Sequence, residues 1–132
     1  MNKVHTVEQA VEHISSGQSI LCGDFLGVGN PELLISGILE KDIRDLTLIS
    51  CTTAMPDRGC GRLVSAKRIK KAITSHIGTN PETGRQFNAG ELEIEFVPQG
   101  TLAERIRCGG SGIGGFLTPT GIGTPVEEGK QK

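Results

Sequence analysis

Residues 91–108 read ELEIEFVPQGTLAERIRC and set two elements next to each other. Acidic and apolar residues alternate through the first seven positions, a pattern that predicts a strand with one buried face. Pro98 ends this strand. Thr101 and Glu104 then form a Thr-x-x-Glu capping box, which predicts that a short helix begins at Thr101.

Gln99 lies between these two elements, at the carboxyl end of the expected strand. Open α/β sheets bind their ligands at the carboxyl ends of the strands, so Gln99 is a candidate site residue. An ordinary connection with a solvent-facing amide accounts for the same pattern equally well.

A glycine-rich run follows the expected helix, with seven glycines between positions 109 and 123. This composition predicts a loop whose backbone approaches another group closely. Residues 110–115 also satisfy the pattern G-x-G-x-x-G. A dinucleotide site needs a strand before that pattern and a helix after it. Here a helix precedes it and a β-prone, proline-bearing segment follows, so the sequence excludes such a site.

Upstream, expected strands alternate with expected helices. We predict strands over residues 19–22, 46–50 and 72–77, and helices over residues 7–14, 30–39 and part of 59–66. The first helix has a capping box at Thr6–Gln9 and Gly17 as its C-cap, and residues 79–84 are expected to form a turn followed by an exposed loop. The alternation predicts an α/β fold, with an open, mainly parallel sheet flanked by helices.

The connection after the first strand reads GDFLGVG over residues 23–29. Asn30, Pro31 and Glu32 follow it and predict a helix start, with Asn30 as N-cap and Pro31 as the first helical residue. A glycine-bearing turn of this kind exposes backbone N–H groups, which can bind an anion or a developing oxyanion. Many such turns bind nothing.

Length and charge restrict the possible functions. The chain has 132 residues, enough for one domain, a net charge of −1 and a pI of about 6.3, so nothing attracts the whole chain to nucleic acid or to an anionic membrane. It contains neither the apolar segment of a signal peptide nor an apolar run approaching about 20 residues, and a cytoplasmic location is expected. For the basic residues 67–71, a solvated face is favoured over a nucleic-acid or phosphate site.

Four widely spaced cysteines, Cys22, Cys51, Cys60 and Cys108, form no C-x-x-C pair, which favours reduced, mostly buried thiols. The three histidines do not stand at metal-ligand spacing from them, so no metal site is expected. The chain also lacks the G-x-S-x-G, H-E-x-x-H and P-loop motifs and shows no paired carboxylates. We therefore expect half of a site, which another polypeptide completes.

Long motifs resemble a known family. Residues 91–110, 114–124 and 126–130, together with the first turn, resemble the A (alpha) subunit of family I CoA-transferases. Residues 75–86 are most similar to the branch that moves CoA among acetate, butyrate and acetoacetate. The resemblance spans nearly the whole of residues 1–132, which form a single domain. Relatives continue well past Gly129, so the chain is expected to be the N-terminal portion of such a subunit.

The resemblance implies a ping-pong reaction. A glutamate in a Ser-Glu-Asn-Gly motif of the partner B (beta) subunit attacks an acyl-CoA and then carries CoA as a thioester. Coenzyme A is a substrate, and no cofactor is bound permanently. The implied partners are the B subunit in a hetero-oligomer, acyl-CoA and short-chain carboxylates, without nucleic acid or membrane.

The resemblance also implies roles for residues of this chain. Gln99 would position the partner glutamate. The implied substrate-binding residues are Gly23, Asp24, Phe25, Gly27, Gly29, Cys51 and Thr52. Two positions depart from the family: Asp24 replaces the second glycine of the turn, and Cys51-Thr52 replace a pair that begins with Asn. A carboxylate at position 24 would raise the pKa of the partner glutamate and hinder an anionic acyl substrate.

Two other functions are considered. The departures leave open a non-catalytic relative that acts as an assembly or acyl-CoA-binding module. A phosphosugar isomerase-type domain shares the general architecture, but its site needs an acid–base pair that this sequence does not offer.

Overall fold

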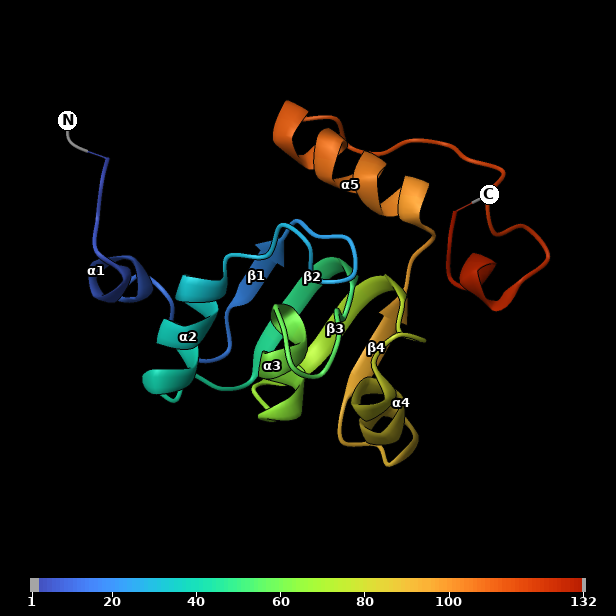
Figure 1. The fold of residues 1–132 in the computed structure, drawn as a ribbon. Coiled ribbons are helices and arrows are strands. Elements are labelled where there is room, and N and C mark those ends of the chain that lie inside the picture. The colour runs from blue at the N-terminus through green and yellow to red at the C-terminus, as the bar shows by residue number, and fades with distance from the viewer. Residues whose placement is uncertain (1–2, 132) are drawn as a thin grey trace.

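The computed structural model describes residues 3–131 (Figure 1). Met1, Asn2 and Lys132, which belong to the predicted domain, lie outside the described residues. The elements are α1 (Val7–Val11), β1 (Ser19–Cys22), α2 (Glu32–Glu40), β2 (Leu46–Thr52), α3 (Cys60–Ser65), β3 (Ile69–His76), α4 (Pro81–Asn88), β4 (Glu93–Phe96), α5 (Gln99–Ser111) and a 3-10 helix (Pro125–Glu127).

The four strands form one parallel sheet in the order β1-β2-β3-β4. The register aligns Ile20, Leu48, Ala72 and Ile94 in one row across the sheet. These apolar side chains belong to the hydrophobic core or pack against it. The open parallel α/β sheet predicted from the alternating pattern is therefore confirmed.

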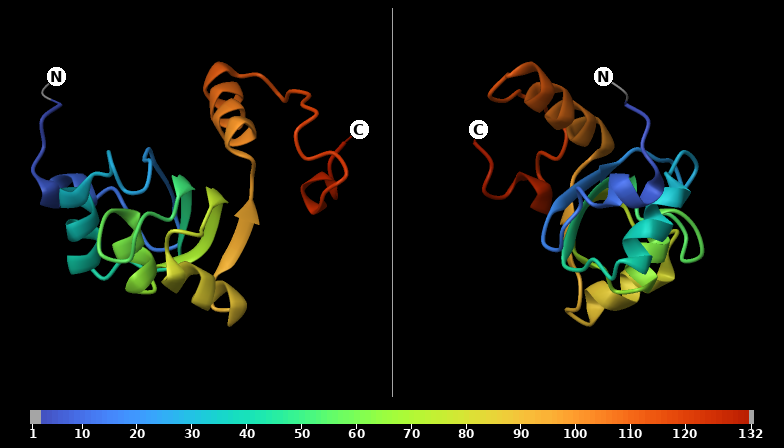
Figure 2. Two further views of the ribbon diagram at one scale, coloured as in Figure 1. Left: turned by 45° about the vertical axis from the view of Figure 1, so that its right-hand side comes forward. Right: turned by 90° about the vertical axis from the view of Figure 1, so that its left-hand side faces the viewer.

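Helices α1 to α4 all lie on one face of the sheet (Figure 2). In a parallel sheet with sequential strand order, right-handed connections place every crossover helix on the same side. Ile35 and Ile38 of α2 and Leu63 and Val64 of α3 are almost fully buried against the strands. This helix-covered face contains the main core.

The opposite face carries a second row of side chains, Leu21, Ile49 and Ile73, which alternate with the core row because successive strand residues point to opposite faces. Leu21 is 55% exposed, and Ile49 and Ile73 are half-buried. We call this side the uncovered face. β1 is thus a half-exposed edge strand, whereas the sequence predicted a buried strand.

α5 lies beyond the carboxyl ends of the strands, on the side away from α2 to α4 (Figures 1 and 2). Leu102 anchors it by burial, with 4% of its surface exposed. Arg105 donates to a Glu95 carboxylate oxygen of β4 at 2.8 Å. A few contacts therefore fix the position of this helix.

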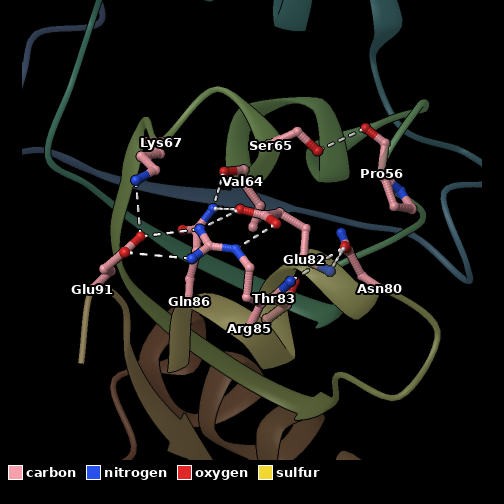
Figure 3. Close-up of polar contacts among 10 residues, drawn as sticks. All are labelled: Pro56, Val64, Ser65, Lys67, Asn80, Glu82, Thr83, Arg85, Gln86 and Glu91. Carbon is pink, nitrogen blue, oxygen red and sulfur yellow. Dashed lines mark hydrogen bonds and ion pairs between the residues drawn. The ribbon is translucent and has the colours of Figure 1, made fainter. Parts of the chain in front are cut away.

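The predicted loop over residues 79–84 is wrong, because Pro81 begins α4. Asn80 is its N-cap, and the Asn80 Oδ1 accepts hydrogen bonds from the backbone N–H groups of Glu82 and Thr83. Gln86 donates to the Val64 carbonyl at 2.8 Å and ties α4 to α3 (Figure 3). Asn-Pro-Glu here is the same helix-start signal as at Asn30.

Helix boundaries confirm one capping box and contradict the other. Thr6 and Gln9 exchange both hydrogen bonds, although α1 ends at Val11 and its C-cap is Glu12 rather than Gly17. α5 begins at Gln99, with Pro98 as N-cap, so Thr101 lies inside its first turn. The Pro98 carbonyl accepts a hydrogen bond from the Leu102 N–H, so the helix begins before the capping box predicted at Thr101.

The basic residues around position 70 form ion pairs, in agreement with a solvated face. Lys67 pairs with Glu91 at 2.9 Å and Lys71 with Glu93 at 2.8 Å. Figure 3 shows Lys67 and Arg85 converging on Glu91.

No helix within residues 3–131 has the length and apolar character needed to cross a bilayer.

Candidate functional site

The first βα turn, residues 23–30, is organised by the Asp24 carboxylate. Its oxygens accept from the Ser50 hydroxyl at 2.6 Å, the Thr52 hydroxyl at 2.8 Å and the Gly27 N–H at 3.1 Å. Ser50 and Thr52 are buried residues of β2, and Gly27 adopts a φ of +87°. The carboxylate therefore links the turn after β1 to the end of β2.

The turn after β2 has the same form. A pair of antiparallel bridge contacts joins Phe25 to Val28 in the first turn and Met55 to Arg58 in the second. The two turns pack closely: a Cβ at Gly27 would lie 3.1 Å from the Arg58 Cγ. FLGV and MPDR share no residues, and only the glycine that follows each of them, Gly29 and Gly59, hints at this similarity in the sequence.

Residues of the first turn hold the start of α3. The Asn30 Oδ1 accepts from the Cys60 N–H at 2.7 Å, and the Glu32 Oε1 accepts from the Gly59 N–H at 2.6 Å. The prediction that Asn30 caps its own helix is therefore wrong: Pro31 is the N-cap of α2, and the Asn30 side chain instead accepts from the first backbone N–H of α3, whose N-cap residue is Gly59. A Cβ at Gly61 would lie 1.8 Å from the Met55 carbonyl oxygen, so this junction requires glycine.

The third turn continues the series. The Asn80 Nδ2 donates to the Thr53 carbonyl at 3.0 Å, and the Thr79 hydroxyl donates to the Ala54 carbonyl at 3.1 Å. Each βα turn thus binds the next, and the carboxyl edge of the sheet forms a continuous hydrogen-bonded rim.

A cavity of about 140 Å³ opens at this edge, between the ends of β1 and β2 and the underside of α5. Its polar lining includes Asp24, Ser50, Cys51 and Gln99. Its apolar lining comes from both sides, with Leu21 and Ile49 on the uncovered face and Leu102 and Ile106 on α5.

Four predicted site residues meet at this cavity: Gly23, Asp24, Cys51 and Gln99. Gln99 is the first residue of α5 and is exposed. Some 75 residues of chain separate it from Gly23, yet the fold brings the two together. The roles assigned to them remain predictions.

The other predicted residues lie around the cavity rather than on its wall. Phe25 is 67% exposed at the tip of the turn, and Gly27 and Gly29 shape the turn with φ values of +87° and +91°. Thr52 is buried and donates to Asp24, so it supports the wall from behind.

Among the described residues, the cavity lining contains a single charged residue and two cysteine thiols. Asp24 is the one charged residue in its lining among residues 3–131. The Cys51 thiol lies 3.9 Å from the Ser75 hydroxyl. The neighbouring Cys22 thiol, also in the lining, and burial together raise the pKa of the Cys60 thiol. All four cysteines are free thiols; Cys60 and Cys108 are buried, whereas Cys22 and Cys51 are only partly buried.

Sequence reasoning missed the apolar half of the cavity and the Ser50 hydroxyl. Ile106 follows Leu102 by four residues, a spacing that puts both on one helix face, and this signal was available. The hydrogen bond between Ser50 and Asp24 depends on strand register and left no trace in the sequence.

In the part of the chain that the structure describes, no group of His, Cys, Asp and Glu could hold a metal ion.

The glycine run is placed differently from the prediction. Gly109 and Gly110 continue α5, and Gly112 ends it in the left-handed conformation, with φ +68°. A Cβ at Gly110, Gly112, Gly114 or Gly115 would meet no described atom within 4 Å. At Gly121, by contrast, a Cβ would lie 3.1 Å from the Val126 Cγ1. Among residues 3–131, the close approach predicted for this run is therefore made at Gly121 and not in residues 110–115.

Comparisons with known proteins show what the chain as a whole is similar to. The sequence profile of a family described as Coenzyme A transferase matches residues 4–132. The chain is similar to the acetate CoA-transferase subunit alpha of Escherichia coli (strain K12), with 54% identity over 129 residues that cover 98% of this chain and 59% of that protein. It is also 47% identical to the acetoacetyl-CoA:acetate/butyrate CoA transferase alpha subunit of Clostridium acetobutylicum, over 99% of this chain and 60% of that one.

A solved structure supports the same relationship. The fold matches the crystal structure of an acyl-CoA transferase apoenzyme from Escherichia coli O157:H7 with a TM-score of 0.76 and 26% identity. The match covers 91% of this chain and 25% of that one. The chain spans about 60% of the length of the two alpha subunits that it resembles.

Proposed function

The chain belongs to the coenzyme A transferase family, and from this membership we propose that it forms part of the alpha subunit of a short-chain acyl-CoA transferase. The enzyme would exchange CoA among acetate, butyrate and acetoacetate, and coenzyme A would be its substrate. A beta subunit would supply the attacking glutamate. The observation that carries the proposal is the cavity at which Gln99 meets the glycine turn at Gly23 and Asp24.

In the proposed reaction, the partner glutamate carboxylate attacks the acyl carbonyl and the CoA thiolate leaves, which forms an acyl-glutamyl anhydride. The thiolate then attacks the glutamyl carbonyl and releases the free carboxylate, which leaves CoA bound to the enzyme as a thioester. A second carboxylate reverses these steps. The thioester energy is conserved throughout.

This chain would contribute the wall opposite the glutamate. The Gln99 side-chain amide has donors that can hold the attacking carboxylate in line with the acyl carbon. Preorganised donors of this kind are worth about 10²- to 10³-fold in rate apiece. Since Gln99 is exposed at the edge of the cavity, it is accessible to a partner.

The Asp24 hydrogen bonds argue against the non-catalytic alternative. This alternative treated Asp24 as a carboxylate that disturbs the site. Its oxygens instead accept from Ser50, Thr52 and Gly27, so the side chain serves the turn itself. A carboxylate with these partners is a structural element of the rim.

The experiment is a CoA-exchange assay on the chain co-expressed with its beta subunit, with acetoacetyl-CoA and acetate as substrates. We expect turnover by the pair, and a loss of about 10²-fold in kcat for Gln99→Leu. Gln18→Leu, at the opposite edge of the sheet, is the matched control. A pair without exchange activity that becomes active as Asp24→Gly with Cys51→Asn would instead establish the non-catalytic alternative.

A further inference from the structure

Two of the four thiols are neighbours at the carboxyl edge of the sheet. Cys22 is the last residue of β1, and Cys60 is the first residue of α3, some 38 residues further along the chain. Cys60 is a fully buried member of the hydrophobic core, and Cys22 packs against the same core. The two thiols also influence each other's pKa, as side chains in contact do.

The Asn30 side chain holds the two elements together. Its Nδ2 donates to the carbonyl of Gly23, the residue after Cys22, at 3.3 Å. Its Oδ1 accepts from the Cys60 N–H at 2.7 Å. One side chain thus joins the end of β1 to the start of α3, so the proximity of the thiols is built into the backbone.

The sheet separates the other cavity thiol from Cys60. Cys22 pairs with Ser50 in the strand register, so both lie on the helix-covered face, where α3 also lies (Figure 2). Cys51 follows Ser50 on the same strand and therefore points to the uncovered face. Cys108 lies on α5, away from α3. Among residues 3–131, Cys22 is thus the thiol placed to react with Cys60.

We propose that Cys22 and Cys60 are a redox-active pair, which a low-molecular-weight disulfide converts into a reversible intramolecular disulfide. The Cys22 sulfur attacks one sulfur of the reagent, releases one thiol and remains as a mixed disulfide. The Cys60 sulfur then attacks the Cys22 sulfur and releases the second thiol. The two protein thiols lose two electrons and two protons in total, and the reagent takes up both as it becomes two thiols.

Burial assigns different roles to the two thiols. Cys22 is only partly buried and lines the cavity, so a small reagent can reach it, whereas Cys60 has no exposed surface. The Cys60 thiol lowers the pKa of Cys22, although burial and the Asp24 carboxylate oppose this ionisation. Because the thiolate is the reactive form, Cys22 is the attacking thiol.

Cys60 is the resolving thiol. In the free protein, the Cys22 thiol and burial raise the pKa of Cys60, which protects it from direct attack on a reagent. Once Cys22 is part of a mixed disulfide, its thiol no longer raises the pKa of Cys60. The first step therefore prepares the second, and the two steps should occur in this order only.

The disulfide would cross-link the end of β1 to the start of α3. A cross-link that closes a loop of some 38 residues restricts the unfolded chain and so favours the folded one. We expect the oxidised chain to unfold at a temperature roughly 10 °C higher than the reduced chain. An oxidised chain that unfolds at the same or a lower temperature would overturn this stabilising role.

The experiment treats the folded full chain with hydroxyethyl disulfide and maps its cysteines by mass spectrometry of proteolytic peptides. We expect a peptide pair linked through Cys22 and Cys60, two hydrogen atoms lighter than the two free thiols, which dithiothreitol separates again. Cys60→Ala should stop at a mixed disulfide on Cys22. Cys22→Ala should leave Cys60 unreacted over the time in which the wild-type chain is converted.

Cys51→Ala and Cys108→Ala are the matched controls, because each removes a thiol outside the pair, and both should form the same link. In urea all four thiols are accessible, so their modification there shows that the reagent is active. A folded wild-type chain in which Cys22 and Cys60 remain free, or in which Cys22 keeps the mixed disulfide, would overturn the proposal.

The test does not depend on the folding of any variant, because the link is first sought in the wild-type chain. It is also independent of the proposed function, since it reads the cysteines and not CoA exchange. A chain that forms the link but shows no exchange with its partner would contradict the transfer function alone. A chain that exchanges CoA but forms no link would contradict the redox pair alone.

Discussion

The two faces of the sheet differ in construction. The helix-covered face is a continuous core in which Leu48 and Leu63 are fully buried. The uncovered face carries only half-buried side chains, and α5 is held over one end of it by Leu102 and the Arg105–Glu95 pair. Stability is thus concentrated on one side of the strands, while the cavity lies on the other. Substitutions should therefore separate folding from function according to the face that they touch.

The largest effect is expected at the junction of the second turn and α3. Gly61→Ala would place a Cβ 1.8 Å from the Met55 carbonyl oxygen, a backbone atom that can move only if the turn moves. We expect a loss above about 4 kcal/mol in the free energy of unfolding, or no folded protein. Urea unfolding followed by circular dichroism measures it.

The matched control for Gly61→Ala is Gly84→Ala in α4. A Cβ there meets no atom within 4 Å, so this variant should gain about 0.5–1 kcal/mol. Equal unfolding midpoints for the two variants would contradict the close contact at Gly61.

The next effect compares neighbours on one strand. Leu48 points to the helix-covered face and Ile49 to the uncovered face. Leu48→Ala should cost about 2–5 kcal/mol, since it leaves a hole in a closed core. Ile49→Ala should cost less than half as much, because this side chain is only half-buried. Equal losses in thermal unfolding would refute the distinction between the faces.

A smaller effect is expected in the rim. Thr52→Val keeps the shape of the side chain but removes a 2.8 Å hydrogen bond to Asp24. We expect a loss of about 1–3 kcal/mol, since the part-buried Asp24 carboxylate loses one donor and the buried Ala54 N–H loses the Thr52 hydroxyl as its acceptor. Thr47→Val, at the other end of the same strand, is the control. If the two variants are equally stable, Asp24 does not organise the turn.

The Arg105–Glu95 pair should affect activity more than stability. Both side chains are about one third exposed, so Arg105→Ala should change the free energy of unfolding by less than about 1 kcal/mol. If the pair positions α5, CoA exchange should still fall roughly tenfold. Lys70→Ala, an exposed basic residue of β3, provides the comparison. If Arg105→Ala lowers the free energy of unfolding but leaves CoA exchange unchanged, the pair stabilises the fold and does not position α5 for the reaction.

The smallest effect is a pH dependence. Hydrogen bonds from Arg85 and Gln86 lower the pKa of Glu82 to about 2 from its ordinary value of 4.5. The ionised carboxylate is favoured in the folded state, so its stabilisation is present above pH 4.5 and is lost as pH falls toward 2. Glu82→Gln should therefore show a shallower loss of stability across that window. Parallel curves for the two proteins would show that the pairing contributes nothing measurable.

Much of the fold could be predicted from the sequence because local signals and tertiary contacts agree there. The capping box at Thr6 and the apolar strand from Leu46 are examples. Prediction failed where a tertiary partner decided the outcome. Asn30 and Asn80 begin the same Asn-Pro-Glu signal, yet Asn30 caps a neighbouring helix and Asn80 caps its own.

For the candidate site, the polar residues could be predicted from the sequence, but the apolar wall that encloses the cavity could not. Gln99 and the glycine turn at Gly23 could be proposed because strand ends and glycine turns have local signatures, whereas Asp24 and Cys51 were indicated only by the resemblance to the family. The apolar wall from α5 could not, since it depends on how that helix crosses the sheet. The role of Asp24 was also hidden, because strand register brings Ser50 and Thr52 to it.

The sequential strand order has a consequence for folding of the chain during its synthesis on the ribosome. Each βα unit can settle on its predecessor as it is made, because its contacts are with the unit just before it. The glycine turn and α5 are the exception, since roughly 75 residues separate them. At about 5–20 residues per second, synthesis of α5 would follow that of the turn by some 4–15 seconds. A nascent chain can therefore form its first three βα units before α5 completes the cavity.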